Sequence, residues 1–411
     1  MTTQRLYFDD AYATRFEARI VSAVEHDGVS DVVLDRTLFY PEGGGQPADH
    51  GTLGGQAVVD VQVEGGEIRH RTEGAAPPAG SSVEGVVAFD RRFDHMQQHT
   101  GQHLLSSLFA SRFGASTVSF HLGRSSATID IARASLTPDE VVAVEEDAAR
   151  VIRAASPVVP TLHEDPSTVP PGLRKEAEVA GPLRIVTIGD VDACPCGGTH
   201  VQSTAEIESV VIVGQERVKD GLHRVEFLCG GRARRDHRAK LVLARALVRS
   251  LSVEERELAG ASERLVERLR AAEKTVRAQN RELVPVRAEA LMAGAVSVGD
   301  RRLLIAALDA PAEGEKGDLA ALATTLERRG DVCALLVQPG AKLAVACVTP
   351  AGAGIDATAC LRAVISEVGG AGGGGPTFAQ GGVPDAGAGE AVLARGRVVL
   401  TDALQVNSAG G

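Results

Sequence analysis

The sequence contains no tryptophan and few other aromatic residues, so its hydrophobic cores cannot rest on large rings. Aromatic residues make up 3% of the 411 residues, whereas hydrophobic residues as a whole make up 44%. The cores are therefore expected to consist mainly of Val, Leu, Ala and Ile. A chain of this length is expected to form roughly two to four domains.

Long apolar runs are also missing, which argues against a signal peptide and a membrane-spanning helix. The first ten residues already include Arg5, Asp9 and Asp10. We therefore expect a cytoplasmic protein without a membrane partner, in which the six cysteines are reduced. Only Cys194 and Cys196 lie close to each other in the sequence.

Basic residues are in deficit, and the net charge of −11 argues against indiscriminate binding to nucleic acids. The stretch from residue 232 to residue 290 is an exception, with fifteen Lys or Arg and nine Asp or Glu, a net charge of +6. Its densest basic cluster comprises Arg232, Arg234, Arg235, Arg238 and Lys240. Two interpretations stay open for this cluster, a solvated helix face or a face that contacts phosphates.

Two short strings carry metal-binding side chains four residues apart, His99 with His103 and Cys196 with His200. The first pair precedes an apolar run typical of a helix, and positions i and i+4 share a helix face. The second pair flanks two glycines, which allow a short loop to curl around an ion. Three imidazoles and one thiolate suit tetrahedral Zn²⁺, so the sequence predicts a zinc site formed by all four.

The pattern of short strands, helices and turns divides the chain into four expected parts. Residues 1–90 alternate short strands and turns, which is typical of a small barrel or sandwich, and we assign a small β-barrel. Residues 91–231 read as an α+β zinc-binding domain, with Thr137 and Glu140 as a helix capping box. Residues 232–292 show a heptad seam, which predicts a coiled-coil-like helical hairpin arm, with a second capping box at Ser252 and Glu255. Residues 293–411 alternate strands and helices, which predicts a C-terminal α/β domain. The fold class is therefore α+β multidomain.

A glycine-rich run extends from Gly369 to Gly375 within this last domain. It contains neither a Walker loop nor a dinucleotide fingerprint. Because apolar residues border it, we interpret it as a backbone platform that closely approaches a phosphate or another backbone, rather than as a linker.

A third constellation, Tyr40-Pro-Glu-Gly-Gly-Gly-Gln46, precedes the two metal-binding strings. With those strings in this order, the chain resembles the free-standing alanyl-tRNA editing proteins, the AlaX family, in its long form. The resemblance covers Asp35 to about Ala233 with specific motifs. It continues to the C-terminus, where the helical arm and the Gly369–Gly382 segment resemble the C-terminal domain of alanyl-tRNA synthetase.

The resemblance implies an aminoacyl-tRNA deacylase that hydrolyses mischarged tRNA(Ala), chiefly Ser-tRNA(Ala) and also Gly-tRNA(Ala). Such an enzyme is needed because an apolar pocket rejects a substrate with one extra hydroxyl only about 10²-fold. The resemblance places Thr37 where its hydroxyl reads serine, with Gln46 and the Gly43, Gly44 and Gly45 loop in the same pocket. His121 is either a substrate contact or a packed strand residue. The C-terminal domain is expected to bind tRNA, with Gly372, Gly373 and Gly374 exposing their amides, and the arm or this domain offers a route to a homodimer.

Several alternatives stay open at this stage. Four protein ligands are typical of a structural zinc site, whereas a hydrolytic zinc keeps one position for water. Cys194 competes with Cys196 as a ligand, and the resemblance selects Cys196. The other candidates are a non-catalytic zinc-stabilised tRNA-binding protein and a threonyl-type editing module. A phosphoesterase is disfavoured because the sequence has no aspartate-rich metal motif.

Overall fold

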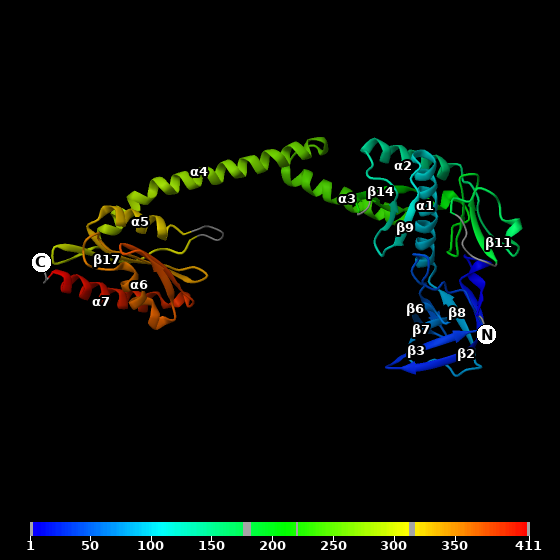
Figure 1. Cartoon of the computed structure of the whole chain (residues 1–411), viewed down its shortest axis with the longest axis horizontal. Coiled ribbons are helices and arrows are strands. Elements are labelled where there is room, and N and C mark those ends of the chain that lie inside the picture. Colours follow the sequence, from blue (N-terminus) through cyan, green and yellow to red (C-terminus); the bar gives the residue numbers. More distant parts are fainter. Residues whose placement is uncertain (1–2, 176–181, 219–220, 312–316, 409–411) are drawn as a thin grey trace. The chain divides into compact units, whose positions relative to one another are not determined.

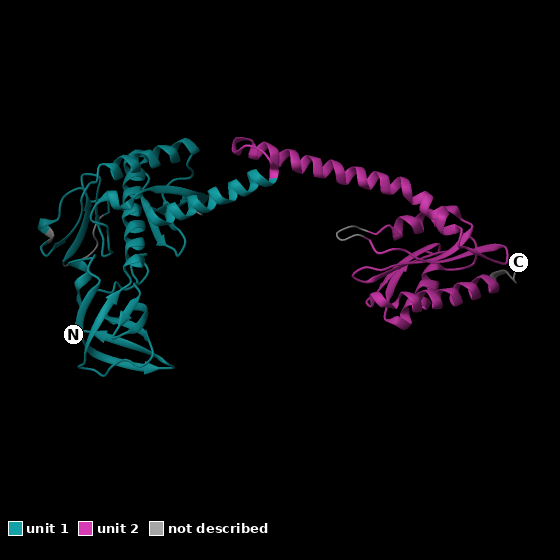
Figure 2. Cartoon of the chain, turned by 180° about the vertical axis from the view of Figure 1, so that it is seen from behind, with its two compact units in different colours: residues 1–250 teal, residues 251–411 magenta. Residues whose placement is uncertain are grey.

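The computed structural model describes residues 3–175, 182–218, 221–311 and 317–408 (Figure 1). Its contacts divide the chain into two compact units, Met1–Ser250 and Leu251–Gly411, which Figure 2 colours separately. Both units combine sheets and helices, so the expected mixed α+β multidomain class is confirmed. The boundary between the units falls inside the predicted helical arm, and the four-part division stays a prediction. Among the described helices, none is both long and apolar enough to cross a bilayer.

A closed six-stranded barrel forms the N-terminal part of the first unit. Its strands are arranged in the order β2, β3, β7, β6, β5 and β8. Their bounds are β2 (Arg15–His26), β3 (Val29–Leu34), β5 (Gly51–Leu53), β6 (Gln56–Glu64), β7 (Glu67–Glu73) and β8 (Ser82–Val87). The short strands β1 (Gln4–Arg5) and β4 (Arg36–Thr37) pair in parallel beside it. Apolar side chains alternate along β2 and fill the interior, as expected for strands with one buried face.

A long buried helix, α1 (Phe89–Phe113), follows the barrel and organises the rest of the unit. It contacts a four-stranded sheet in the order β14, β15, β10 and β9 and a three-stranded sheet in the order β11, β12 and β13. The bounds are β9 (Thr117–Leu122), β10 (Ala127–Ile131), β11 (Val158–His163), β12 (Leu183–Ile188), β13 (Asp192–Pro195), β14 (Val210–Arg217) and β15 (His223–Cys229). Helix α2 (Pro138–Arg153) packs on α1. Helix α3 (Gly230–Leu251) follows β15 at the C-terminal end of the unit. The predicted capping box of Thr137 and Glu140 is confirmed.

A buried ion pair fixes α1 to the barrel. Arg92 on α1 is fully buried, and its guanidinium binds the carboxylate of Asp49, with Nε 2.9 Å from Oδ2. The same guanidinium donates to the carbonyl oxygens of Leu38 and Ala11. Because both charged side chains are fully buried, the pair holds the barrel and the helix in one arrangement.

The second unit is built on a six-stranded sheet in the order β16, β17, β18, β19, β21 and β20. Helices α6 and α7 cover one face, and α5 with the end of α4 covers the other. The bounds are α4 (Leu258–Met292), β16 (Val296–Val298), β17 (Arg301–Ala307), α5 (Leu319–Arg329), β18 (Val332–Gln338), β19 (Leu343–Val348), α6 (Ala357–Ile365), β20 (Ala371–Gly374), β21 (Phe378–Val383) and α7 (Gly389–Ser408). Every residue of the central strand β18 is buried.

One sequence-based expectation for this unit needs correction. The capping box is formed by Glu254 and Glu257 around the 3₁₀ turn Glu255–Glu257 that precedes α4, not by Ser252 and Glu255, because Ser252 takes a positive φ of 53° where the chain turns. Part of the glycine run forms the edge strand β20, which pairs with β21, so the predicted close approach to another backbone is confirmed and the contact with a phosphate stays a prediction. A Cβ on Gly372 would lie 2.7 Å from the carbonyl oxygen of Gln380, so glycine permits this close pairing with β21.

The heptad positions of α4 remain exposed. Leu265, Leu269, Val276 and Leu283 are 44–58% exposed. The coiled-coil packing predicted from them stays a prediction.

Candidate metal centre

Four side chains from two segments converge in the first unit. His99 and His103 lie one turn apart on α1, whereas Cys196 and His200 belong to the turn after β13. One donor atom from each lies within 4.8 Å of the other three. The sulfur of Cys196 is 3.4 Å from Nε2 of His99 and 3.3 Å from Nε2 of His200. The bond lengths of tetrahedral zinc imply ligand separations of about 3.5 Å, so this donor set fits such an ion.

Each of the three imidazoles is held from behind by a different partner. Nδ1 of His99 is 2.8 Å from Oε1 of Gln46, and Nδ1 of His103 is 3.1 Å from a carboxylate oxygen of Asp192. Nδ1 of His200 is 3.2 Å from the hydroxyl of Thr100. An amide or carboxylate oxygen can only accept, so Nδ1 of His99 and of His103 carries the proton. Their Nε2 lone pairs then face the cluster, which is the arrangement that metal-binding histidines use.

The electrostatics of the cluster favour a thiolate. Burial would raise the pKa of Cys196, but the charges of His99, His200 and His103 hold that pKa well below its ordinary value. Burial opposes protonation of His103, yet the Cys196 thiolate and the hydrogen bond to Asp192 raise its pKa to about 9. A metal cation can replace that proton, because thiolate and imidazole ligands bind in their deprotonated forms. Cys194 lies outside the cluster, and burial raises its pKa to about 11.

Glycine is required in the turn that carries Cys196. A Cβ on Gly198 would lie 2.2 Å from Cε1 of His99 and 2.9 Å from Oε1 of Gln46. Arg184 supports the same turn by donating to the carbonyl oxygens of Cys196 and Gly198. The turn can therefore press against α1 only because Gly198 has no side chain.

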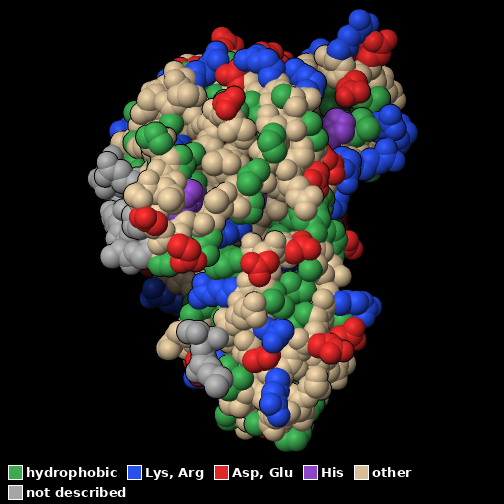
Figure 3. All heavy atoms as spheres, turned by 90° about the vertical axis from the view of Figure 1, so that its right-hand side faces the viewer, with side chains coloured by type: hydrophobic (Ala, Val, Ile, Leu, Met, Phe, Trp, Pro, Cys, Tyr) green, Lys and Arg blue, Asp and Glu red, His purple; other side chains and the backbone are tan. Residues whose placement is uncertain are grey.

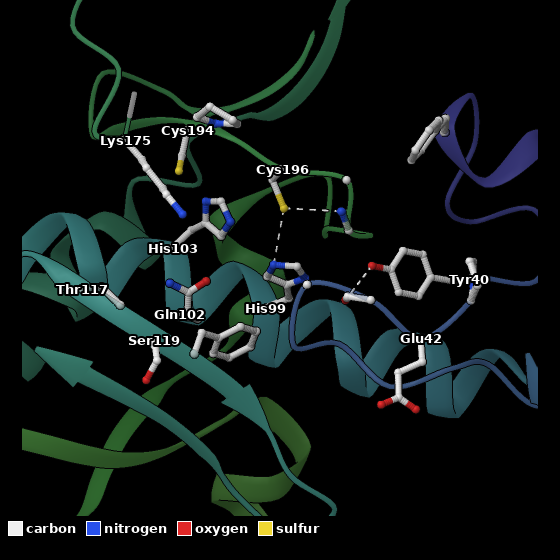
Figure 4. Close-up of a pocket in the computed structure, with 18 of the residues that line it drawn as sticks. Tyr40, Glu42, His99, Gln102, His103, Thr117, Ser119, Lys175, Cys194 and Cys196 are labelled. Atoms are coloured by element: carbon white, nitrogen blue, oxygen red, sulfur yellow. Dashed lines mark hydrogen bonds between the residues drawn. The ribbon is translucent and has the colours of Figure 1, made fainter. Parts of the chain in front are cut away.

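A cavity of about 460 Å³ opens directly onto the metal-binding cluster (Figure 4). His99, His103 and Cys196 form part of its wall, and the barrel side contributes Tyr40 and the glycine loop. Strand β9 forms another wall with Thr117, Ser119 and Phe120, whose ring stacks on His99 at 5.3 Å between centroids. A cavity of this size suits a small organic group.

The predicted pocket residues take different places around this cavity. Gly43 and Gly44 line it. Gln46 is fully buried behind His99, and besides that contact it donates to the hydroxyl of Thr199 over 2.8 Å, so it positions a metal ligand. His121 is exposed on β9 and does not line the described cavity.

Thr37 lies inside the barrel rather than on the cavity wall. It is fully buried, and its hydroxyl is 2.8 Å from Nε2 of His70 and accepts from the backbone N–H of Phe39. Thr37 is not among the described residues that line the cavity. Its role in reading serine stays a prediction.

Most of the predicted basic cluster makes local ion pairs. Arg232 is 6% exposed and binds Asp94, which fastens α3 to α1. Arg234 pairs with Glu208 and Lys240 with Asp236, and Arg235 approaches Asp94. Arg238 makes no ion pair with any described residue. On the face shown in Figure 3, acidic and basic side chains are interspersed rather than gathered into one basic patch.

Sequence reasoning missed several residues that the structure places at the site. Gln102 lines the cavity between the two histidines of α1, and Lys175 lines it beside Cys194. Arg174 binds Asp192 with two hydrogen bonds and so orients His103 indirectly. Gln102 could have been suspected from its place within the His99–His103 string, but Lys175 and Asp192 carry no local signal.

Comparisons with known proteins place this site in a class. Residues 183–226 match the family described as the threonyl and alanyl tRNA synthetase second additional domain. Residues 6–91 match the class II (A) tRNA synthetases. The barrel and the metal-binding core are thus similar to two segments of the synthetases for threonine and alanine.

Individual relatives make this relationship more specific. The chain is 37% identical to the alanyl-tRNA editing protein AlaX-L of Pyrococcus horikoshii, over 56% of this chain and 59% of that protein. It is 38% identical to the alanyl-tRNA editing protein Aarsd1 of Mus musculus, over 54% of this chain and 58% of that protein. Alanine–tRNA ligase of Halorubrum lacusprofundi is 34% identical over 93% of this chain but only 42% of the ligase. The chain therefore spans about half the length of the curated relatives it matches.

A solved structure also matches part of the chain. The C-Ala domain of Aquifex aeolicus alanyl-tRNA synthetase covers 27% of this chain and 96% of its own length, at 24% identity and a TM-score of 0.22.

Proposed function

We propose that this protein is a trans-editing deacylase that hydrolyses the ester of mischarged tRNA(Ala), chiefly Ser-tRNA(Ala) and also Gly-tRNA(Ala). The observation that carries the proposal is the cavity of about 460 Å³ whose wall includes the donor cluster of His99, His103 and Cys196. The names of the relatives support tRNA(Ala) as the substrate class.

Zn²⁺ is the proposed metal, held by His99, His103, Cys196 and His200. Three imidazoles and one thiolate in tetrahedral proximity match the preferences of zinc. Bound zinc would supply a Lewis acid beside the ester or fix the shape of the pocket.

The residues of the chain have separable tasks in this proposal. Gln46, Asp192 and Thr100 hold the imidazoles in orientation, and β9 with the glycine loop encloses the aminoacyl group. In the reaction, the oxygen of water bonds to the ester carbon, the bond from that carbon to the ribose oxygen breaks, and the ribose oxygen receives a proton. An aminoacyl ester is reactive enough for positioning and charge stabilisation to accelerate this hydrolysis substantially.

Charge at the cavity favours a nucleotide ligand. Arg5 and Lys175 both line the cavity, and neither forms an ion pair with a described residue. Arg5 lies over the ring of Phe8, 5.6 Å from its centroid, which keeps the guanidinium near the opening. Free cations at this place would attract the phosphates next to the terminal adenosine.

Further tRNA contacts are proposed for the arm and the second unit. The candidates remain Arg234, Arg235, Arg238 and Lys240 on α3 and the amides of Gly372, Gly373 and Gly374 on β20. Arg232 is less suited, because its guanidinium is buried against Asp94. The exposed leucines of α4 support the proposal of a homodimer through the arm, which light scattering of the wild type and Leu269→Glu would test.

Deacylation of Ser-tRNA(Ala) by the zinc-loaded protein tests the proposed function directly. We expect hydrolysis that requires stoichiometric metal and is lost in His103→Ala. The matched control is His121→Ala, which removes an exposed imidazole outside the cluster and is expected to leave zinc content unchanged. If the wild type binds zinc and tRNA(Ala) but never releases serine, the protein is a zinc-stabilised tRNA-binding protein instead. Preferential hydrolysis of Ser-tRNA(Thr) would indicate the threonyl-type alternative.

A further inference from the structure

Gln102 presents an unused hydrogen-bond acceptor to the cavity. It lies on α1 between His99 and His103, lines the cavity and is only 6% exposed (Figure 4). Its Nε2 donates to Oγ of Ser106 over 2.8 Å, and that oxygen also accepts from the hydroxyl of Thr117 over 2.7 Å. The amide plane is therefore fixed. Oε1 makes no hydrogen bond to a described residue, and it is not among the fully enclosed unpartnered atoms, so it remains accessible from the cavity.

The neighbouring polar groups on the cavity wall are already engaged. The hydroxyl of Ser119 donates to Asp130 over 2.7 Å, and that of Tyr40 donates to the carbonyl oxygen of Gly43 over 3.0 Å. Arg5 and Lys175 are exposed donors, which water can solvate whatever ligand is bound. When a ligand fills the cavity, water no longer reaches Oε1 of Gln102. This acceptor therefore strongly favours a ligand that supplies a hydrogen-bond donor.

Two donors are available on a seryl ester, the α-ammonium group and the side-chain hydroxyl. Seryl, glycyl and alanyl esters all carry the ammonium group, so a contact with it cannot separate them. Only the hydroxyl distinguishes serine. Binding an alanyl ester would bury the Gln102 oxygen without a partner, and sites of this type discriminate strongly against the analogue that lacks the hydroxyl.

We propose that Gln102 is a specificity-determining residue whose Oε1 accepts a hydrogen bond from the hydroxyl of an ester-linked serine. This inference rests on the proposed function and deepens it by naming the group that reads the substrate. It competes with the motif-based assignment of Thr37, whose hydroxyl already contacts His70 and the backbone of Phe39. Ser106 is a positioning residue in this scheme, because it orients the amide without reaching the cavity wall.

The test compares three esters on tRNA(Ala): seryl, α-aminobutyryl, in which a methyl group replaces the hydroxyl, and glycyl. The full-length zinc-loaded protein is measured as wild type, Gln102→Met and Thr37→Val. Methionine preserves the length of the side chain but removes the acceptor. We expect Gln102→Met to lower kcat/KM for the seryl ester by about 10- to 100-fold. The rate for the α-aminobutyryl ester should rise, because the variant leaves no buried acceptor unpaired, the rate for the glycyl ester should not fall, and metal content should stay stoichiometric.

Specific outcomes would overturn the proposal. An equal loss on all three esters with metal retained would mean that Gln102 contacts the ammonium group or supports the pocket. Loss of serine preference in Thr37→Val but not in Gln102→Met would assign the reading to Thr37. Should Gln102→Met fold poorly, Ser106→Ala provides the decision, because it frees the amide and must reduce the preference for serine over α-aminobutyrate. A wild type that hydrolyses none of the esters refutes the proposed function itself.

Discussion

Oε1 of Gln46 lies 2.8 Å from Nδ1 of His99, although 53 residues separate them in the sequence. The glutamine ends the glycine loop beside the barrel, whereas the histidine lies on α1. The same oxygen accepts from the backbone N–H of Thr199 in the turn that carries Cys196 and His200. One buried amide thus connects the barrel motif to both halves of the metal-binding cluster.

The contact predicts that Gln46→Leu weakens metal binding without removing a ligand. Loss of such an orienting partner typically reduces metal affinity by about 10- to 100-fold. Competition with a chromophoric chelator would measure it. Gln62→Leu is the control, because among the described residues the amide of Gln62 donates to Glu42 and Asp60, neither of which belongs to the cluster. Equal zinc affinity in wild type and Gln46→Leu would show that Gln46 contributes packing and does not orient the metal ligand.

The Arg92–Asp49 pair predicts a large loss of stability on removal of one charge. Both side chains are fully buried, so Asp49→Asn leaves the Arg92 guanidinium without a counter-ion. Such changes cost about 3–5 kcal/mol in unfolding free energy. Asp147→Asn provides the comparison, since Asp147 pairs with the half-exposed Arg112 and exposed pairs contribute about 0–1 kcal/mol. Chemical denaturation should show a much larger loss of unfolding free energy in Asp49→Asn than in Asp147→Asn. Similar losses in the two variants would contradict a special role for the buried pair.

His70 predicts that the barrel loses stability in acid. Burial lowers the pKa of His70 to about 4, from 6.5 in the unfolded chain. The unfolded state therefore takes up a proton first as the pH falls. The stabilisation is complete above pH 6.5 and declines towards pH 4, by about 3 kcal/mol in total. Unfolding free energies of wild type and His70→Gln across this range should converge as the pH falls, and parallel curves would show that His70 does not titrate in this way.

Truncation separates the contribution of the second unit from that of the site. A chain that ends at Ser250 retains the cavity and all four cluster residues. We expect its zinc content and its rate at saturating substrate to stay close to those of the full chain. Its KM for Ser-tRNA(Ala) should rise about tenfold or more, because the proposed contacts of α4 and the C-terminal domain are lost, whereas the basic residues of α3 are retained. Steady-state kinetics at two salt concentrations would measure this, and an unchanged KM would exclude those segments from tRNA binding.

Local patterns in the sequence were sufficient to predict structural features that depend on nearby residues, such as helix faces and helix starts. The i, i+4 spacing of His99 and His103 indicated a shared helix face, and Thr137 with Glu140 indicated a helix start, which the structure confirms. The prediction for Ser252 was wrong because its capping pattern matches a helix start, whereas the turn requires a positive φ at this residue; a 3₁₀ turn begins after Glu254, and α4 begins at Leu258.

Contacts between segments that are distant in the sequence could not be predicted from local patterns. Nothing near Asp49 marks it as the partner of Arg92, and nothing near Asp192 marks it as the group behind His103. The cavity position of Gln102 and the barrel position of Thr37 depend on where β9 and β7 lie. Spacing along the chain does not contain these distances.

The sequence by itself determined the chemistry of the candidate metal centre, because the four side chains that can bind a metal occur in two short strings. Only the tertiary structure decided which groups orient those imidazoles and which face the cavity. The physical reason is that donor type is a property of one residue, whereas orientation, burial and unsatisfied hydrogen bonds arise only when α1, β9, the barrel and the Cys196 turn pack together.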